Sequence, residues 1–188
     1  MFKITFLHGL GMAIAGAVLN LALYLAGLQD DPANMTANQL IGLVVGLVIT
    51  VVGLRLAMKA RREQQSAEDG FGYGAALGTG TLTAVWSSLL GAGFHVLYLT
   101  VINPGFVDAL VDGQLAKLEA EGMSGAQLDQ AEGMVRLFSG VPMQAIFAVV
   151  FGLFFGFIVS LIVAAFMKRP ATESFDDAAG DPPPLINA

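Results

Sequence analysis

The sequence predicts an all-α membrane protein with four transmembrane helices. Of its 188 residues, 55% are hydrophobic and only 13% are charged, against about 25% charged in an average soluble domain. The mean hydropathy is +0.70, and the apolar residues are gathered into four long runs. Such runs expose their side chains to lipid, so the lipid bilayer is the first expected partner.

The four apolar runs cover about residues 4–28, 40–58, 73–102 and 142–167. A helix rises 1.5 Å per residue, so about 20 residues cross a hydrocarbon core of about 30 Å. The runs are continuous and rich in Leu, Ala and Gly, whereas an outer-membrane strand alternates in polarity. The first run is longer than the apolar core of a signal peptide, so we expect it to remain as a span. Residues 1–169 are therefore expected to form one four-helix membrane domain.

Positively charged residues predict the orientation of the spans. Most of the nine Lys and Arg residues fall at one set of helix ends, namely Lys3, Arg55, Lys59, Arg61, Arg62, Lys168 and Arg169. The opposite ends carry only Lys117 and Arg136, among several acids. Because cationic loops stay in the cytoplasm, we expect both termini there, an N-in/C-in topology. Residues 170–188 are polar and proline-containing, so we expect a disordered cytoplasmic tail.

Between the third and fourth spans, residues 104–139 predict an amphipathic helical hairpin on the extracytoplasmic side. Apolar residues recur there at helical spacing, with charged residues between them. We expect Asn103 to cap a helix that begins at Pro104, and Ser124 with Gln127 to form a capping box for a second helix. Two interpretations of the hairpin stay open. It packs as a cap on the ends of the spans, or it offers a docking surface for a partner or lipid.

Glycines four residues apart predict close helix packing. Such pairs let a neighbouring helix approach, and they occur in three spans as Gly42 with Gly46, Gly74 with Gly78, and Gly152 with Gly156. The spacing does not distinguish packing within one chain from packing between copies. A homo-oligomer is therefore as open as a compact monomer.

The order of these features resembles a known family. It combines a second span that ends in basic residues, the sequence Phe71-Gly72-Tyr73-Gly74-Ala75 leading into the third span, the sequence Asn103-Pro104-Gly105-Phe106, an acidic helical hairpin and a last span. Together they are similar to a bacterial membrane family catalogued as domain of unknown function 4199. The resemblance implies a multi-pass protein of the bacterial inner (cytoplasmic) membrane with no established activity. It brings no catalytic residues.

Polar side chains inside the spans are the candidate functional positions, because such groups are costly in a membrane and usually face the bundle interior. The candidates are His8, Asn20, Arg55, His95 and Gln144. Counted along the helices, His8 and Arg55 fall nearer the cytoplasm and the other three nearer the outer side. His95 and Asn20 therefore lie at a depth where they can hydrogen-bond across helices.

The same count argues against catalytic, cofactor and metal sites. His8 and His95 are expected about 20 Å apart, which is too far to share a metal ion. None of the four apolar runs contains Asp or Glu, and the chain has no cysteine. A serine nucleophile would lack an acid to orient its base. A net charge of −6 also argues against nucleic acid as a partner.

Two classes of function remain. The first is a non-enzymatic accessory or structural membrane component, which acts with a protein partner. It is favoured by the glycine-spaced faces and the shaped hairpin. The second is a small oligomeric transporter or channel. Its pathway would use one of the two groups of intramembrane polar residues, the one nearer the cytoplasm or the one nearer the outer side. The two classes of function differ in whether the intramembrane polar groups share a wet cavity or are each satisfied locally.

Overall fold

The protein is described by a computed structural model that covers residues 1–29, 32–66 and 69–170. Apart from Pro170, the tail predicted to be disordered lies outside these residues. The elements in chain order are α1 (Phe2–Leu25), η1 (Pro32–Asn34), α2 (Met35–Glu63), α3 (Tyr73–Leu97), the π-helical segment η2 (Tyr98–Ile102), α4 (Phe106–Ala120), α5 (Ala126–Ser139) and α6 (Val141–Met167). Helices α1, α2, α3 with η2, and α6 are long and apolar enough to cross a membrane. The predicted all-α fold is confirmed for the described residues, with four helices that have the length and composition of membrane spans.

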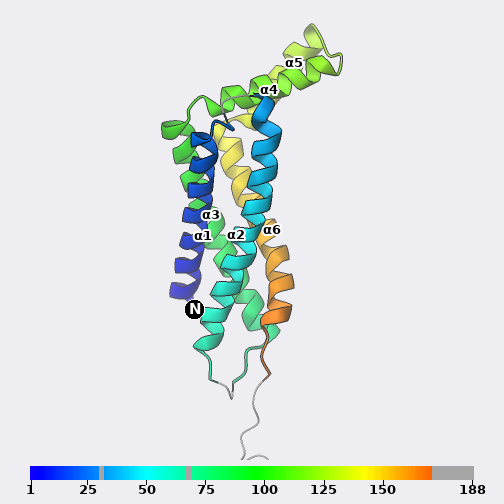
Figure 1. The fold of residues 1–188 in the computed structure, drawn as a ribbon. Helices are drawn as coiled ribbons and strands as arrows, with labels where there is room; N and C mark the ends of the chain where they lie inside the picture. The colour runs from blue at the N-terminus through cyan, green and yellow to red at the C-terminus, as the bar shows by residue number, and fades with distance from the viewer. Residues whose placement is uncertain (30–31, 67–68, 171–188) are drawn as a thin grey trace, which may run out of the picture.

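The four long helices run side by side as a bundle, and α4 and α5 form a helical hairpin at one end (Figure 1). We call this the hairpin end. The opposite end holds the N-terminus, the connection from α2 to α3 and the end of α6, and we call it the basic end. Helix α5 points away from the bundle axis, so it covers little of the spans' ends.

Helix α3 lies at the centre of the bundle and makes its most extensive contacts with α6 and α1. Small residues make these contacts close. A methyl group added at Gly156 would lie 2.6 Å from Ala84 Cβ, and one at Gly152 would lie 2.5 Å from Ser88 Oγ. One at Gly9 of α1 would meet the Cβ of Trp86 at 2.6 Å. The helices therefore approach one another where a side chain would keep them apart.

Of the three glycine pairs, Gly152 with Gly156 lies in a close contact within the chain, whereas the other two pairs have no close helix neighbour there, which leaves packing between copies open for them. Among the described residues, added methyl groups at Gly42, Gly46 and Gly74 meet nothing within 4 Å, and one at Gly78 meets only the end of the Met1 side chain. Close contacts that the spacing rule missed occur at Gly9, Gly53 and Gly80. The spacing places two glycines on one face of a helix, but it does not say whether a neighbour lies against that face.

The basic end is closed by a short antiparallel bridge between Phe71 and Arg169. The N–H of Phe71 donates to the Arg169 carbonyl at 2.7 Å, and the reverse bond is 2.8 Å. The Phe71 side chain is fully buried in the core, and Gly70 before it has a φ of +64° that favours glycine. The Tyr73 hydroxyl donates to the Leu161 carbonyl of α6 at 3.2 Å. The Phe71–Tyr73 motif thus joins the start of α3 to the end of α6.

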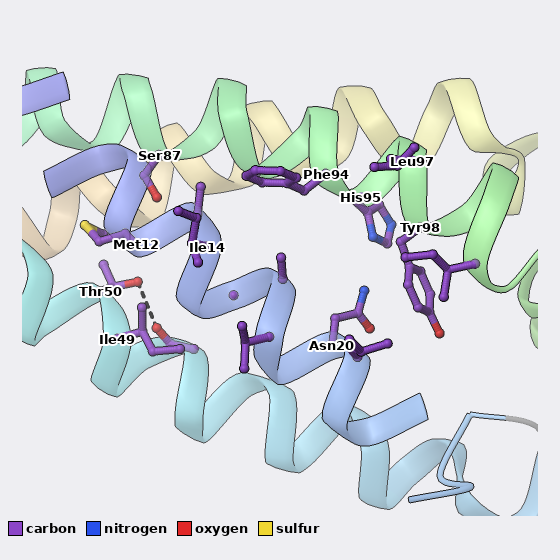
Figure 2. A pocket seen from close by; sticks show the side chains of 18 residues that line it. Met12, Ile14, Asn20, Ile49, Thr50, Ser87, Phe94, His95, Leu97 and Tyr98 are labelled. Carbon is purple, nitrogen blue, oxygen red and sulfur yellow. Dashed lines mark hydrogen bonds between the residues drawn. The ribbon is translucent and has the colours of Figure 1, made fainter. Parts of the chain in front are cut away.

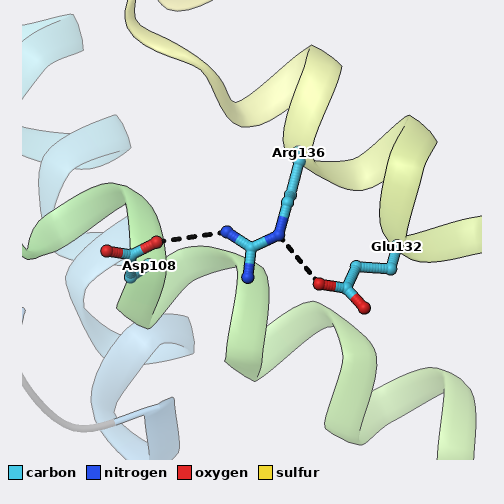
Figure 3. Close-up of polar contacts among 3 residues, drawn as sticks. All are labelled: Asp108, Glu132 and Arg136. Carbon is cyan, nitrogen blue, oxygen red and sulfur yellow. Dashed lines mark hydrogen bonds and ion pairs between the residues drawn. The ribbon is translucent and has the colours of Figure 1, made fainter. Parts of the chain in front are cut away.

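In the hairpin, Arg136 of α5 joins the two helices (Figure 3). Its Nε donates to Glu132 at 2.8 Å within α5, and an Nη donates to Asp108 of α4 at 3.2 Å. These hydrogen bonds, the Glu132 bond first, raise the pKa of the Arg136 guanidinium above its ordinary value. All three side chains are exposed, so the pairs orient the hairpin more than they stabilise it.

The predicted capping box at the start of α5 is wrong. The N-cap residue is Gly125, and no side chain makes a hydrogen bond that caps the helix there. Gly125 has a φ of +58°, a left-handed conformation that glycine adopts without strain. The chain therefore turns into α5 through backbone geometry, and Ser124 lies one residue too early to serve as the cap.

The packing of α3 on α6 gives a first prediction. We expect Gly156→Ala to lower the stability of the bundle in detergent by about 1–3 kcal/mol, because the added methyl group meets Ala84 Cβ, which cannot rotate away. The matched control is Gly42→Ala, where the same methyl group meets no described atom and helix propensity improves. The measurement is thermal unfolding in one detergent. Equal melting temperatures for the two variants would contradict the close α3–α6 contact.

Candidate functional site

The most connected polar group of the bundle lies at the hairpin end and is centred on the side chain of Gln29, which is buried. Its Nε2 donates to Asn20 Oδ1 at 2.8 Å and to Asn38 Oδ1 at 3.2 Å, which uses both amide hydrogens. Its Oε1 accepts from the Tyr98 hydroxyl, which in turn accepts from Asn103 Nδ2 at 2.9 Å. We call these five residues the hairpin-end polar cluster. The cluster links α1, α2 and η2 to the residues that follow α1 and η2.

The π-helical turn η2 positions two members of the cluster. In a π-helix the backbone bonds run over five residues, and here the N–H of Asn103 donates to the Tyr98 carbonyl at 2.8 Å. This spacing brings the Asn103 side chain beside the Tyr98 ring, where Nδ2 reaches the hydroxyl. The prediction that Asn103 caps the next helix is therefore wrong. The N-cap of α4 is Gly105, and no side chain caps it.

Aromatic rings surround Tyr98 on several sides. Tyr24 of α1 and Phe106 of α4 meet its ring edge-on, with centroids 6.1 and 6.3 Å away, and His95 stacks at 6.5 Å. The Tyr98 side chain is 4% exposed. Aromatic packing fixes the ring while its hydroxyl bonds to the amides, so Tyr98 is both an apolar and a polar link in this end of the bundle.

A second set of hydrogen bonds begins at His95 and leads to the hairpin. His95 Nε2 lies 3.0 Å from Gln144 Oε1, and Gln144 Nε2 donates to the Ser139 carbonyl at 2.6 Å. The Ser139 hydroxyl accepts from Gln114 of α4 at 3.5 Å. Because an amide oxygen only accepts, His95 carries a hydrogen on Nε2 in this arrangement. These bonds join α3 to α6 and α6 to both hairpin helices.

The hydrogen bond that equal depth would allow between His95 and Asn20 does not form among the described residues. His95 bonds Gln144 on α6, while Asn20 of α1 bonds Gln29, which lies in the segment that follows α1. The reason is that each side chain has a nearer amide partner, and one of these partners, Gln29, lies beyond the first apolar run. Depth along the helices placed His95 and Asn20 at one level, but depth does not say which helix faces which.

Both side chains nevertheless border one cavity of about 460 Å³ between α1, α2 and α3 (Figure 2). Asn20, His95 and Tyr98 lie together toward one end of it, and Met12, Thr50 and Ser87 toward the other. Most of the remaining lining is apolar. A smaller cavity of about 230 Å³ shares some of these residues and reaches α6, the shared ones being Met12, Thr50, Ser87 and Gly91.

The other two predicted positions lie elsewhere. His8 Nδ1 donates to the Ile4 carbonyl of its own helix at 2.8 Å. Arg55 is exposed on α2 beside α6, and no described residue forms a hydrogen bond or an ion pair with it. Of the five predicted positions, the structure therefore joins His95 and Gln144 directly, places Asn20 on the same cavity as His95, and leaves His8 and Arg55 apart.

Sequence reasoning missed Gln29, Asn38 and Asn103, although they supply most amides of the polar cluster. Each lies at the end of an apolar run or just beyond one, where a polar residue is expected to meet water. The only available signal was the five-residue spacing of Tyr98 and Asn103, which fits a π-helical turn.

The site offers amide, phenol and imidazole groups for hydrogen bonding. Within the described ranges, no group of three His, Asp or Glu side chains is arranged to hold a metal ion.

Four apolar helices of spanning length, held together by polar contacts at one end, define a multi-pass, all-helical membrane protein. Residues 7–169 match the family described as protein of unknown function (DUF4199), and the chain belongs to that family. The family resemblance seen in the sequence is thereby confirmed. No curated protein and no solved structure matches the chain.

The polar cluster gives a second prediction. We expect Tyr98→Phe to lower stability in detergent by about 1–3 kcal/mol, because buried amide groups of Gln29 and Asn103 lose their partner. The matched control is Tyr24→Phe, which removes a hydroxyl that makes no hydrogen bond to any described residue. Thermal unfolding of both variants is the measurement. If the melting temperature of Tyr98→Phe equals that of the wild type, the cluster does not stabilise the hairpin end.

Proposed function

We propose that the chain is a non-enzymatic accessory or structural component of a membrane assembly. One observation carries the proposal: four of the five candidate polar side chains, all except Arg55, bond to groups of the chain itself. Asn20 bonds Gln29, His95 bonds Gln144, and His8 bonds a carbonyl of its own helix. A coupled transporter needs intramembrane groups that exchange partners with a solute or proton. Side chains already bound within the chain suit a structural role better.

The hairpin supports a contact beyond the chain's own bundle. Helix α5 packs on α4 and on the start of α6, and it leaves the large apolar side chains of Met134, Leu137 and Phe138 exposed. Phe138 stacks on Phe147 of α6, with ring centroids 6.4 Å apart, which brings this surface close to the spans. Exposed apolar side chains next to a membrane suit contact with a partner protein or with the lipid interface.

We also infer that both termini lie in the cytoplasm of a bacterial inner membrane, with the hairpin on the other side. The basic end carries most of the Lys and Arg residues outside the hairpin. In the hairpin, Arg136 is neutralised by Asp108 and Glu132. Cationic loops stay in the cytoplasm, and the resemblance to a bacterial family supports the host membrane.

The orientation gives a third prediction, and the absence of native cysteine makes it simple to test. Gln64 and Ser124 are exposed and lie near opposite ends of the bundle. We expect Ser124→Cys to react with a membrane-impermeant thiol reagent in intact cells, and Gln64→Cys to react only after the cells are opened. The opposite pattern would overturn the N-in/C-in topology.

The accessory role gives a fourth prediction. We expect the protein, gently solubilised at native expression, to run at a mass above its own 19.6 kDa plus detergent. The complex should contain an unrelated protein in fixed ratio. Native mass measurement and peptide identification are the readouts, and Met134→Ser with Leu137→Ser is the variant expected to weaken the complex. A chain that runs alone, or only with copies of itself, would contradict this role.

A small oligomeric transporter or channel is the second candidate. The observation in its favour is the pair of adjoining cavities between α1, α2, α3 and α6, which share Met12, Thr50, Ser87 and Gly91. Against it, Asn20, His95 and Tyr98 lie toward one end of the larger cavity, the other end carries only the hydroxyls of Thr50 and Ser87, and its walls are otherwise mainly apolar. Solute flux into vesicles that contain the purified protein, absent from protein-free vesicles, would favour this candidate.

A further inference from the structure

A groove of about 730 Å³ runs along α2 and α6 toward the basic end, away from the polar cluster. Its floor includes Val159 and Val163 of α6, which are buried, and its rims include Val51 and Phe166, which are exposed. The volume falls within the range of about 300–1,000 Å³ found for ligand sites. Because both helices are membrane spans, the open side of this groove faces lipid.

Three cations line the end of the groove. Arg55, Lys59 and Arg62 of α2 are spaced four and three residues apart, so they lie along one face of the helix. They extend over about 10 Å of the helix axis. The apolar walls continue from them toward the middle of the membrane through Leu47 and Val51.

These cations are poorly neutralised by the chain itself. The lining of the groove contains no carboxylate. Glu63 lies 3.8 Å from Lys59, in a pair whose side chains are both more than half exposed. Among the described residues, no carboxylate pairs with Arg55 or Arg62, and Arg169 nearby is engaged by the carbonyls of Gln65 and Ser66. Two guanidinium groups therefore offer donors to an anion from outside the chain.

We propose that this groove binds one phospholipid with a net negative headgroup. Arg55, Lys59 and Arg62 contact the headgroup phosphate, and an acyl chain lies between the apolar rims of α2 and α6. A soluble anion would satisfy the cations but leave the apolar walls uncovered, whereas a phospholipid fills both parts. Basic pockets between membrane helices are a known setting for anionic headgroups.

The proposal does not depend on the accessory role. It requires only that α2 and α6 span a membrane, and it assigns a ligand to Arg55, which no contact within the described chain explains. The contact between α2 and α6 is less extensive than the contact between α3 and α6. A lipid in the groove would therefore also fill space between α2 and α6.

The test is native mass spectrometry of the delipidated full chain, titrated with phosphatidylglycerol or phosphatidylcholine of identical acyl chains. We expect the wild type to take up one phosphatidylglycerol with an affinity about tenfold or more above that for phosphatidylcholine. Arg55→Gln with Arg62→Gln should remove this preference. Arg55→Lys with Arg62→Lys, which keeps the charge, should retain most of it.

The matched control is Lys3→Gln with Arg61→Gln. It removes two cations from the same end of the bundle, but neither residue lines the groove. This variant should keep the wild-type preference. Equal binding of the two lipids by the wild type, or equal loss in the control and the groove variant, would overturn the proposal. Competition by inorganic phosphate at the same concentration as the lipid would overturn it too, because it would reveal a simple anion site.

Discussion

A side chain that carries a hydrogen-bonding group into a membrane finds no water there, so its partner must come from the protein or from lipid. The hairpin end meets this constraint with amides. Gln29 is buried and donates both of its amide hydrogens to asparagines of α1 and α2, while its side-chain oxygen accepts from the Tyr98 hydroxyl. The π-helical turn η2 then allows Asn103 to reach the same hydroxyl. One group of side chains thereby ties three spans together where the chain leaves them.

The rest of the bundle is joined by close helix contacts and a few hydrogen bonds to backbone carbonyls. Gly152 and Gly156 let α6 lie against α3, and Gly9 does the same for α1. At the basic end the Phe71–Arg169 bridge fixes the start of α3 to the end of α6. Helix α2 is held less closely, and the cavity beside α1 and the groove beside α6 both lie along it. These two openings therefore both border the span that packs least extensively on the central helix α3.

Composition and run length predicted the four spans because burial in lipid requires about 20 apolar residues in a row, a signal that needs no knowledge of neighbours. The polar contacts were harder to predict. His95, Asn20 and Gln144 were recognised as buried polar groups, but their partners depend on how helices rotate against each other, which a single sequence does not show. The sequence did not indicate Gln29 as a site residue, because it lies just beyond the first apolar run. The glycine spacing has the same limit, since it identifies a helix face but not the neighbour that packs on it.

A structural role for Asn20, His95 and Gln144 requires that the cavity beside them is not part of a water path through the bundle. Ser87 lies on both cavities, and replacing it with cysteine changes one atom in a chain with no other thiol. The direct measurement is the reaction of Ser87→Cys in membranes with a charged, water-soluble thiol reagent added to both sides. A structural role predicts no reaction until the protein is denatured in detergent. Rapid reaction in the intact membrane would contradict it, because water would then reach the middle of the bundle.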